Sequence, residues 1–251
     1  MMSFWDHVGE LRYRLLWAVA AVAVCAVGGF VAYDWLLTEV FLPPYCRVLE
    51  TLEIDRSCSL VITEPLDGFR TRIKVALYVG VAAATPVLAW HLWRFVAPAL
   101  HRRERRWVVP FVVSATVLFA AGATVAYLTL ERALQFLIDV AGTNVEPLLS
   151  PGAYLGLVTF MMLAFGLGFE FPIVLVFAQL AGLTTPRALH RARRYAIVGI
   201  VAAAAVITPS GDPISLAALS VPMYVSYEAS IVAGHLLTRR RRRAEAAAGT
   251  P

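Results

Sequence analysis

The sequence alternates between long apolar runs and short segments rich in arginine. A helix needs about 20 apolar residues to cross the roughly 30 Å of hydrocarbon in a bilayer. A segment in lipid must also satisfy its own backbone hydrogen bonds, so each such run is predicted to be a helix. The pattern predicts six transmembrane helices, at residues 15–33, 75–92, 108–130, 154–183, 195–209 and 214–237.

Two of these six predicted helices are short. Residues 195–209 would span only about 22 Å as a helix at about 1.5 Å per residue. In the sixth, the apolar stretch that begins at residue 214 is interrupted by Glu228. A bilayer accommodates a short helix by becoming thinner around it. We therefore expect a thinned membrane beside this part of the molecule.

The composition supports a membrane protein. Hydrophobic residues make up 59% of the 251 residues and charged residues 16%, with a mean hydropathy of +0.70. Soluble domains usually hold about 45–50% apolar and about 25% charged residues, which excludes a soluble globular protein. We predict an all-α, polytopic membrane protein in which residues 1–238 form a single membrane domain. Residues 239–251 begin with a run of arginines and are predicted to form a basic, disordered tail.

Basic residues lie mostly on one side of the predicted membrane. They precede the first helix, follow the second, fourth and sixth helices, and make up most of the 22 Lys and Arg residues. Because cytoplasmic loops carry the excess of Lys and Arg, both termini are predicted to face the cytoplasm, from a place in the cytoplasmic membrane. This topology explains the net charge of +5. No pattern of basic and aromatic residues predicts nucleic-acid binding.

Two loops are predicted on the opposite side of the membrane and are expected to cover the outer face. The loop at residues 34–70 holds Cys46 and Cys58, and an oxidising compartment would permit a disulfide between them. Their spacing leaves the bonded and the free state open. No histidine lies near them in the sequence, so no metal site is predicted. The loop at residues 131–152 begins with an amphipathic stretch, which predicts a helix lying at the membrane interface.

Three carboxylates occupy unusual positions. Glu104 lies among four arginines and a histidine, and either forms a local ion pair, worth about 0–1 kcal/mol if exposed, or awaits a cationic partner from outside the chain. Glu170 lies inside the fourth predicted helix beside Pro172, which predicts a kink at that level. An ionised carboxylate in a bilayer costs about 2.5–3.5 kcal/mol. Glu170 is therefore either protonated and bonded to a neighbouring helix or part of a functional polar site, and Glu228 poses the same question.

Several motifs are spread over nearly the whole chain. They are His7-Val8-Gly9-Glu10-Leu11-Arg12-Tyr13-Arg14-Leu15, the segment with Phe95, Pro98 and Glu104-Arg105-Arg106, the run from Phe165 to Pro172, the turn from Thr208 to Asp212, and Pro222-Met223-Tyr224 with Glu228. Together, and in this order, they resemble the motifs of the TatC family, the polytopic core of the twin-arginine translocase.

The resemblance implies a receptor rather than an enzyme, with no cofactor and no metal. It implies that the arginine pair of a signal peptide, carried by a folded precursor protein, binds at a site made of Glu104, Glu10, Phe95, Arg12 and Arg105. It also implies an intramembrane polar site with Glu170 and Glu228. The implied partners are the single-span proteins TatA and TatB, the lipid bilayer and further copies of this chain, and the proton gradient is the implied energy source.

Two other classes of membrane protein are weighed against this reading. A proton-coupled secondary transporter would use Glu170 and Glu228 as a proton relay, but no internal repeat is evident. An intramembrane protease would need a nucleophile with its base or a metal pair, and neither G-x-S-x-G nor H-E-x-x-H occurs. The sequence also holds no G-x-x-x-x-G-K-[ST] run, so no nucleotide-binding site is predicted.

Overall fold

The computed structural model describes residues 4–51, 58–62, 64–96, 108–142, 149–180, 182–208 and 212–248, and the regular elements among them are all helices. The segments that form the six membrane helices are α1 (Phe4–Val31), α4 (Asp67–Val96), α5 (Val108–Ala141), α6 (Pro151–Phe169) continued by α7 (Phe171–Leu180), α9 (Arg193–Ile207) and α10 (Pro213–Ala248). All but α9 are long and apolar enough to cross a membrane. The prediction of six membrane helices with a short fifth is confirmed.

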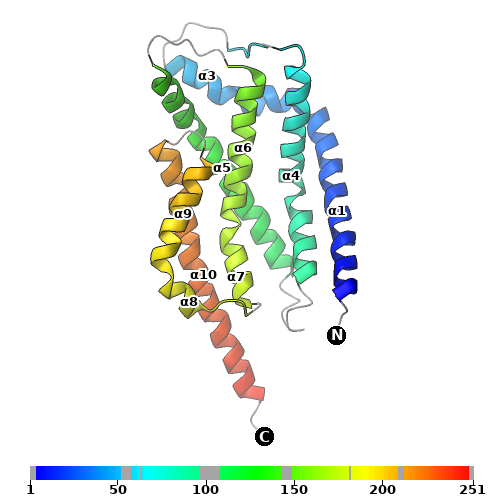
Figure 1. The fold of residues 1–251 in the computed structure, drawn as a ribbon, viewed down its shortest axis with the longest axis vertical. Helices are drawn as coiled ribbons and strands as arrows, with labels where there is room; N and C mark the ends of the chain where they lie inside the picture. Colours follow the sequence, from blue (N-terminus) through cyan, green and yellow to red (C-terminus); the bar gives the residue numbers. More distant parts are fainter. Residues whose placement is uncertain are drawn as a thin grey trace.

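The helices stand side by side (Figure 1). α1 lies at one edge and packs along α4. The middle is occupied by α5 and α6, and α9 lies at the opposite edge beside α10. Three short elements, α2 (Tyr33–Trp35), the π-helix η1 (Leu36–Phe41) and α3 (Leu42–Thr51), lie across the end that is remote from both termini. We call this the cap end, and we call the opposite end, where both termini lie, the terminal end.

Glycines allow the membrane helices to approach closely. A Cβ on Gly80 of α4 would lie 2.8 Å from the backbone of Ala26 in α1. A Cβ on Gly122 of α5 would lie 2.5 Å from the carbonyl oxygen of Phe165 in α6. In lipid, helix association depends on this kind of van der Waals contact between small residues, because hydrocarbon surrounds the helices on all sides.

A disulfide and a hydrogen bond hold the cap end in place. Cys46 of α3 and Cys58 are joined by the disulfide, with their Cα atoms 5.4 Å apart. The hydroxyl of Tyr154 in α6 donates a hydrogen bond to the carbonyl of Phe41 in η1. This hydrogen bond attaches the cap end to a membrane helix that is far away in the sequence.

The second outer loop differs from its prediction. The stretch after residue 130 is helical, as predicted, but it continues α5 to Ala141 and does not form a separate helix at the membrane interface. Ala133 and Leu134 are buried, and Glu131 pairs with Arg47 of α3. No glycine or proline interrupts residues 123–141, so the helix continues until Gly142, where φ is +93°.

The last helix also differs from its prediction. α10 is 36 residues long and continues to Ala248, so most of the tail that was predicted to be disordered is helical. The physical reason is that arginine and alanine are among the strongest helix formers. Nor is the sixth membrane helix short, because the apolar span from Pro213 to Leu236 includes Glu228.

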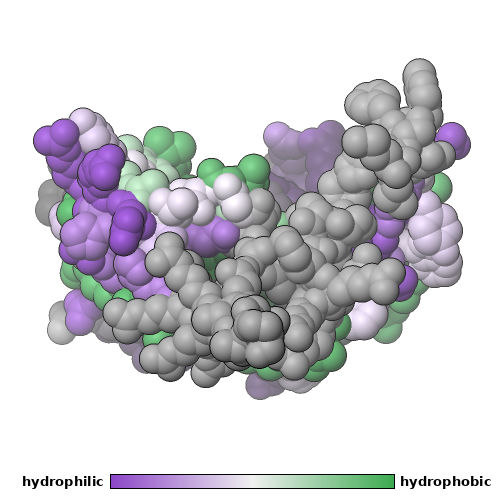
Figure 2. All heavy atoms as spheres, turned by 90° about the horizontal axis from the view of Figure 1, so that it is seen from below, coloured by the Kyte–Doolittle hydropathy of each residue, from purple (hydrophilic) through white to green (hydrophobic). Residues whose placement is uncertain are grey.

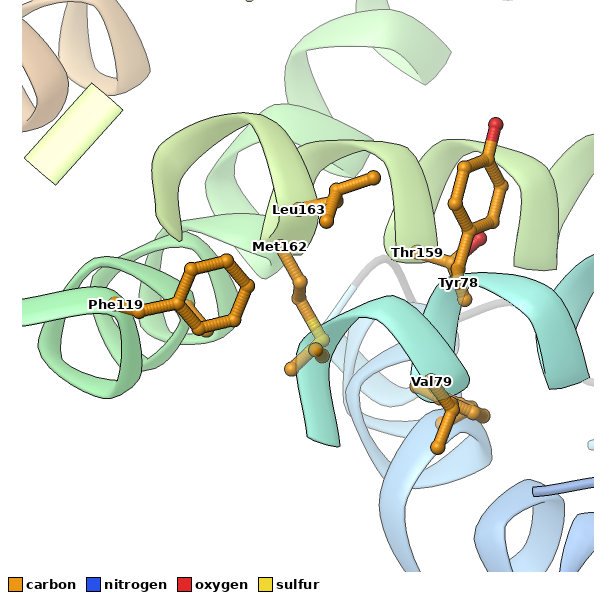
Figure 3. A pocket seen from close by; sticks show the side chains of 9 residues that line it. Tyr78, Val79, Phe119, Thr159, Met162 and Leu163 are labelled. Atoms are coloured by element: carbon orange, nitrogen blue, oxygen red, sulfur yellow. The ribbon is translucent and has the colours of Figure 1, made fainter. Parts of the chain in front are cut away.

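A small cavity lies between α4, α5 and α6 (Figure 3). Its volume is about 60 Å³, and its lining is almost entirely apolar. The hydroxyl of Thr159 in the lining already bonds to the carbonyl of Leu155. Cavities with apolar walls stay dry and offer no orienting contacts, so this one is a packing gap and not a candidate polar site. The labelled side chains around it are Tyr78, Val79, Phe119, Thr159, Met162 and Leu163.

Candidate functional site

One acidic and one basic side chain of α1 form an ion pair at the terminal end. Arg14 donates to Oε1 of Glu10 from Nε at 3.2 Å and also from Nη2. Glutamate four residues before a basic residue is the favourable order on a helix. The two side chains are only 23% and 14% exposed, because they lie on the face of α1 that packs against α4. The second oxygen, Oε2, is buried and has no hydrogen-bond partner in the described part of the chain.

The neighbouring end of α4 is fixed by aromatic packing. Trp93 is 3% exposed, and its ring lies 4.7 Å from that of Phe111 in α5 and 5.8 Å from that of Phe177 in α7. Edge-to-face and tilted ring pairs at these distances stabilise a fixed orientation. Trp93 therefore holds the last turn of α4 in place, directly before the segment that carries Glu104.

His91, near the end of α4, lies close to the Glu10–Arg14 ion pair of α1. Arg14 and Arg94 are both close enough to act on the His91 ring electrostatically. Nδ1 of His91 is buried without a hydrogen-bond partner among the described residues. Two polar atoms that have no partner among the described residues, one on each of two packed helices, therefore lie at the terminal end.

The structure describes only some of the predicted signal-peptide residues. Glu104 and Arg105 lie outside the described residues, and so does the side chain of Phe95, whose backbone forms the last turn of α4. Arg12 is exposed, two residues from Glu10, and so does not share the face that packs against α4. Of the predicted signal-peptide residues, Glu10 therefore lies beside α4, and Arg12 lies on the outer surface of α1.

This arrangement favours one kind of ligand. A buried carboxylate oxygen without a donor accepts charge-assisted hydrogen bonds, which are stronger than neutral ones. Arg14 and Arg94 repel any cation that approaches. A guanidinium offers five donors in a fixed fork, and so it compensates this repulsion with directed bonds better than an ammonium does.

Glu170 lies at a break between α6 and α7, as the predicted kink requires. Pro172 has no N–H to donate to the carbonyl of Gly168, and the N–H of Glu170 bonds to Leu167 at 3.1 Å. Oε1 of Glu170 is buried, and the described residues offer it no hydrogen bond. Gly168, two residues before Glu170, lets Leu219 and Met223 of α10 approach closely at this level.

Glu228 has a partner that the sequence did not indicate. Arg193, at the start of α9, donates from Nη2 to Oε2 of Glu228, and the hydroxyl of Tyr224 donates to Oε1 at 3.1 Å. Arg193 is 40% exposed and Glu228 27%. The acid is thus neutralised locally, and no hydrogen bond or ion pair links it to Glu170 in the described part of the chain.

We expect the Arg193–Glu228 pair to contribute measurably to stability. A double-mutant cycle with Arg193→Gln and Glu228→Gln, read from thermal unfolding, should give a coupling of about 1–2 kcal/mol. This coupling lies between that of exposed ion pairs, about 0–1 kcal/mol, and that of buried ion pairs.

The matched control is the pair Arg70–Glu64, whose atoms are 3.5 Å apart and whose side chains are 68% and 69% exposed. Its coupling should be near zero. Equal couplings for the two pairs would show that Arg193 does not hold Glu228 in place.

Two further polar residues make contacts that the sequence did not predict. Gln179 of α7 donates from Nε2 to the carbonyl of Ser230 in α10 at 3.0 Å, and its only signal was an amide inside an apolar run. Asp212 is 2% exposed, and its Oδ1 accepts from the N–H of Ser215 at 2.6 Å at the start of α10. No group of acidic, histidine and cysteine side chains that could hold a metal occurs among the described residues.

Comparisons with known proteins agree with the fold and the motifs. A family model described as "Sec-independent protein translocase protein (TatC)" matches residues 6–222. The Sec-independent protein translocase protein TatC of Frankia casuarinae is 36% identical over 95% of this chain and 67% of its own length. Its counterpart from Deinococcus radiodurans is 35% identical over 90% and 83%. The one from Aquifex aeolicus is 34% identical over 96% and 98%.

Two solved structures are also similar. A crystal structure of the twin-arginine translocase receptor TatC superposes with a TM-score of 0.72 at 34% identity, covering 92% of this chain and 99% of that one. A second, of the receptor in DDM, gives 0.71 at 32% identity, with coverages of 91% and 99%. Since the family model and these relatives extend over most of its length, the chain belongs to the TatC family.

Proposed function

We propose that this chain is the receptor of a twin-arginine translocase. It binds the paired arginines of a signal peptide at the terminal end and organises single-span partners of the TatA and TatB type for export of the folded precursor. The names of its relatives, a Sec-independent protein translocase and a twin-arginine translocase receptor, support this proposal. The observation that carries it is Oε2 of Glu10, which is buried beside the end of α4 and has no hydrogen-bond partner among the described residues.

The charge distribution supports an orientation with the terminal end in the cytoplasm. Hydrophilic residues gather at one edge of the terminal end, where α8 (Pro186–Arg191) and the start of α9 lie (Figure 2). Arg187, Arg191, Arg193 and Arg194 belong to this region. Cytoplasmic segments carry such an excess, and the disulfide at the cap end suits an oxidising compartment. Both termini then face the cytoplasm, and the chain spans the cytoplasmic membrane.

The short fifth helix is the surface that we assign to the partner helices. α9 holds 15 residues, about 22 Å of helix, and its outer face is apolar. Val198 is 68% exposed and Val206 84%. A helix of this length favours a thinner bilayer, which lowers the barrier for a large cargo that crosses beside it. Further copies of this chain complete the receptor complex.

The transporter alternative gains no support from the comparisons. It would also need Glu170 and Glu228 to exchange protons, whereas Glu228 is engaged by Arg193 and Tyr224. Uptake of a small solute by vesicles that contain this chain alone would favour it.

Photo-crosslinking tests the receptor function. A photoreactive residue at Phe95 or Val96, in the last turn of α4, should crosslink to a folded precursor with an Arg-Arg signal. The same precursor with Lys-Lys should give no crosslink, because an ammonium cannot reproduce the guanidinium fork.

The positional control is a photoreactive residue at Leu66, which is 56% exposed at the cap end and should crosslink to neither signal. Equal crosslinks from position 95 with both signals would contradict arginine recognition at this site. No crosslink with either would contradict the receptor function.

A further inference from the structure

A second candidate site lies at the cap end, far from the signal-peptide site. A pocket of about 690 Å³ opens between the end of α1, η1, residues 58–62 and the first turns of α4. This volume falls within the roughly 300–1,000 Å³ that is typical of ligand sites. Most of its walls are apolar. The apolar side chains that line it include Phe30, Tyr33, Leu37, Leu42, Ile62 and Phe69.

Arg72 is the one basic residue among the described lining residues. Its guanidinium lies 4.8 Å from the ring centre of Phe30 and 5.0 Å from that of Tyr33. It donates to the carbonyl of Phe30, near the end of α1, at 3.2 and 3.3 Å, and to Asp34 at 3.2 Å. These bonds use Nε and Nη2 and leave Nη1 without a hydrogen bond to the described residues. Among the described residues, the pocket therefore holds a fixed cation with one nitrogen left to bond to a ligand.

The wall opposite α4 is held in place. Cys58, at one end of the segment 58–62, is bonded to Cys46 of α3. The N–H of Val61, in the middle of the segment, donates to the carbonyl of Leu149 at 3.2 Å. Because the segment is attached at two points, the pocket stays open, and a ligand does not have to order this segment when it binds.

The pocket lies where the membrane spans end. The apolar span of α1 ends at Val31 and α4 begins at Asp67, so the pocket lies at the ends of two helices that are long and apolar enough to cross a membrane. Ile62 and Phe69 are 62% and 61% exposed at this level. Asp34 is 77% exposed, so its charge is screened by water more than that of Arg72, which is 31% exposed.

We propose that this pocket binds a phospholipid of the leaflet at the cap end. The phosphate lies at Nη1 of Arg72, and part of an acyl chain lies against the aromatic and aliphatic walls. The combination of one fixed cation with apolar walls suits an amphiphile, whereas a soluble anion would gain nothing from the apolar walls. Guanidinium groups recognise phosphate by charge-assisted hydrogen bonds.

The test uses the purified full chain in phosphatidylcholine vesicles that contain phosphatidylglycerol with a photoreactive group on one acyl chain. Crosslinks should concentrate in residues 58–62 and 68–72. Gly68 lines the pocket, and a Cβ there would meet no atom within 4 Å, so Gly68→Leu fills the pocket without a clash. This change should lower crosslinking in both segments about tenfold, a loss of about 1.4 kcal/mol in binding.

Two controls accompany this variant. Gly28 of α1 is equally free of neighbours but does not line the pocket, so Gly28→Leu should leave the crosslinks unchanged. Arg72→Gln should lower them, whereas Arg70→Gln, two residues away on α4, should not. Because Arg72 also bonds to α1, thermal unfolding of Arg72→Gln shows whether the fold survives, and Gly68→Leu tests the pocket independently of that result.

The proposal is overturned if crosslinks spread evenly over the membrane-facing helices and do not change in Gly68→Leu. It is also overturned if residues 58–62 crosslink to a second copy of the chain in place of lipid, because the pocket would then be an interface between copies. Neither result bears on binding of the signal peptide, which takes place at the opposite end.

Discussion

Replacement of Glu104 by Gln is expected to abolish recognition of Arg-Arg signals, and Glu10→Gln is expected to weaken it about tenfold. A glutamine keeps the shape of the side chain but loses the charge that strengthens a hydrogen bond to guanidinium, worth about 1.5–3 kcal/mol. Glu10 should have the smaller effect, because one of its oxygens is already held by Arg14 and only Oε2 remains for a ligand. Export of an Arg-Arg precursor and its crosslinking at position 95 measure both effects.

The control for these variants is Glu64→Gln, an equally conservative change in an exposed acid at the cap end. It should leave export unchanged. Normal protein levels together with normal export in Glu104→Gln would contradict the assignment of the site. A lower protein level in this variant would point to a structural role of Glu104 and would equally contradict it.

The membrane helices could be predicted because apolar runs of the required length have few alternatives in lipid. The break at Glu170 was also predictable from the local sequence, because Pro172 lacks the N–H that would bond to the carbonyl of Gly168, one turn earlier in the helix. The length of α10 could not be predicted, because in the sequence Glu228 looks like the end of an apolar run. In the structure, Arg193 lies beside Glu228 and pairs with it. That contact joins residues 35 positions apart, which helical periodicity does not encode.

The same limit applies to the candidate site. The pattern around residues 7–15 identified Glu10 by resemblance, but the sequence could not show which oxygen Arg14 occupies or that Arg12 lies on the outer surface. Nor could it show that Trp93, Phe111 and Phe177, from three helices, meet at the end of α4. Such contacts depend on how the helices pack, whereas the sequence pattern only says which residues are apolar.

Arg72 did leave a signal in the sequence. It is one of the basic residues on the outer side of the second predicted helix, where the distribution of positive charge predicts few of them. In the structure it finds the carbonyl of Phe30, the carboxylate of Asp34 and two aromatic rings. An exception to a topological rule was therefore the best guide to the second pocket.

The contact between α5 and α6 is expected to be the most sensitive to added volume. Gly122→Leu would place a Cβ 2.5 Å from the carbonyl oxygen of Phe165, and a backbone atom within a helix cannot move aside. Overpacking of this kind costs about 3 kcal/mol or more. At about 2–4 °C per kcal/mol for a chain of this size, the midpoint of thermal unfolding should fall by roughly 10 °C.

Two glycines of the same chain provide graded comparisons for Gly122→Leu. In Gly166→Leu the added Cβ would lie 2.6 Å from the ring of Phe119. Because a side chain can rotate away, the loss of stability should be smaller. Gly199 of α9 has no atom within 4 Å of a Cβ, and leucine is the better helix former, so Gly199→Leu should leave the midpoint unchanged or raise it. If all three variants lowered the midpoint equally, the close approach of α5 and α6 would not be what holds the centre of the molecule together. The order Gly122, Gly166, Gly199 would show that the backbone contact at Phe165 does so.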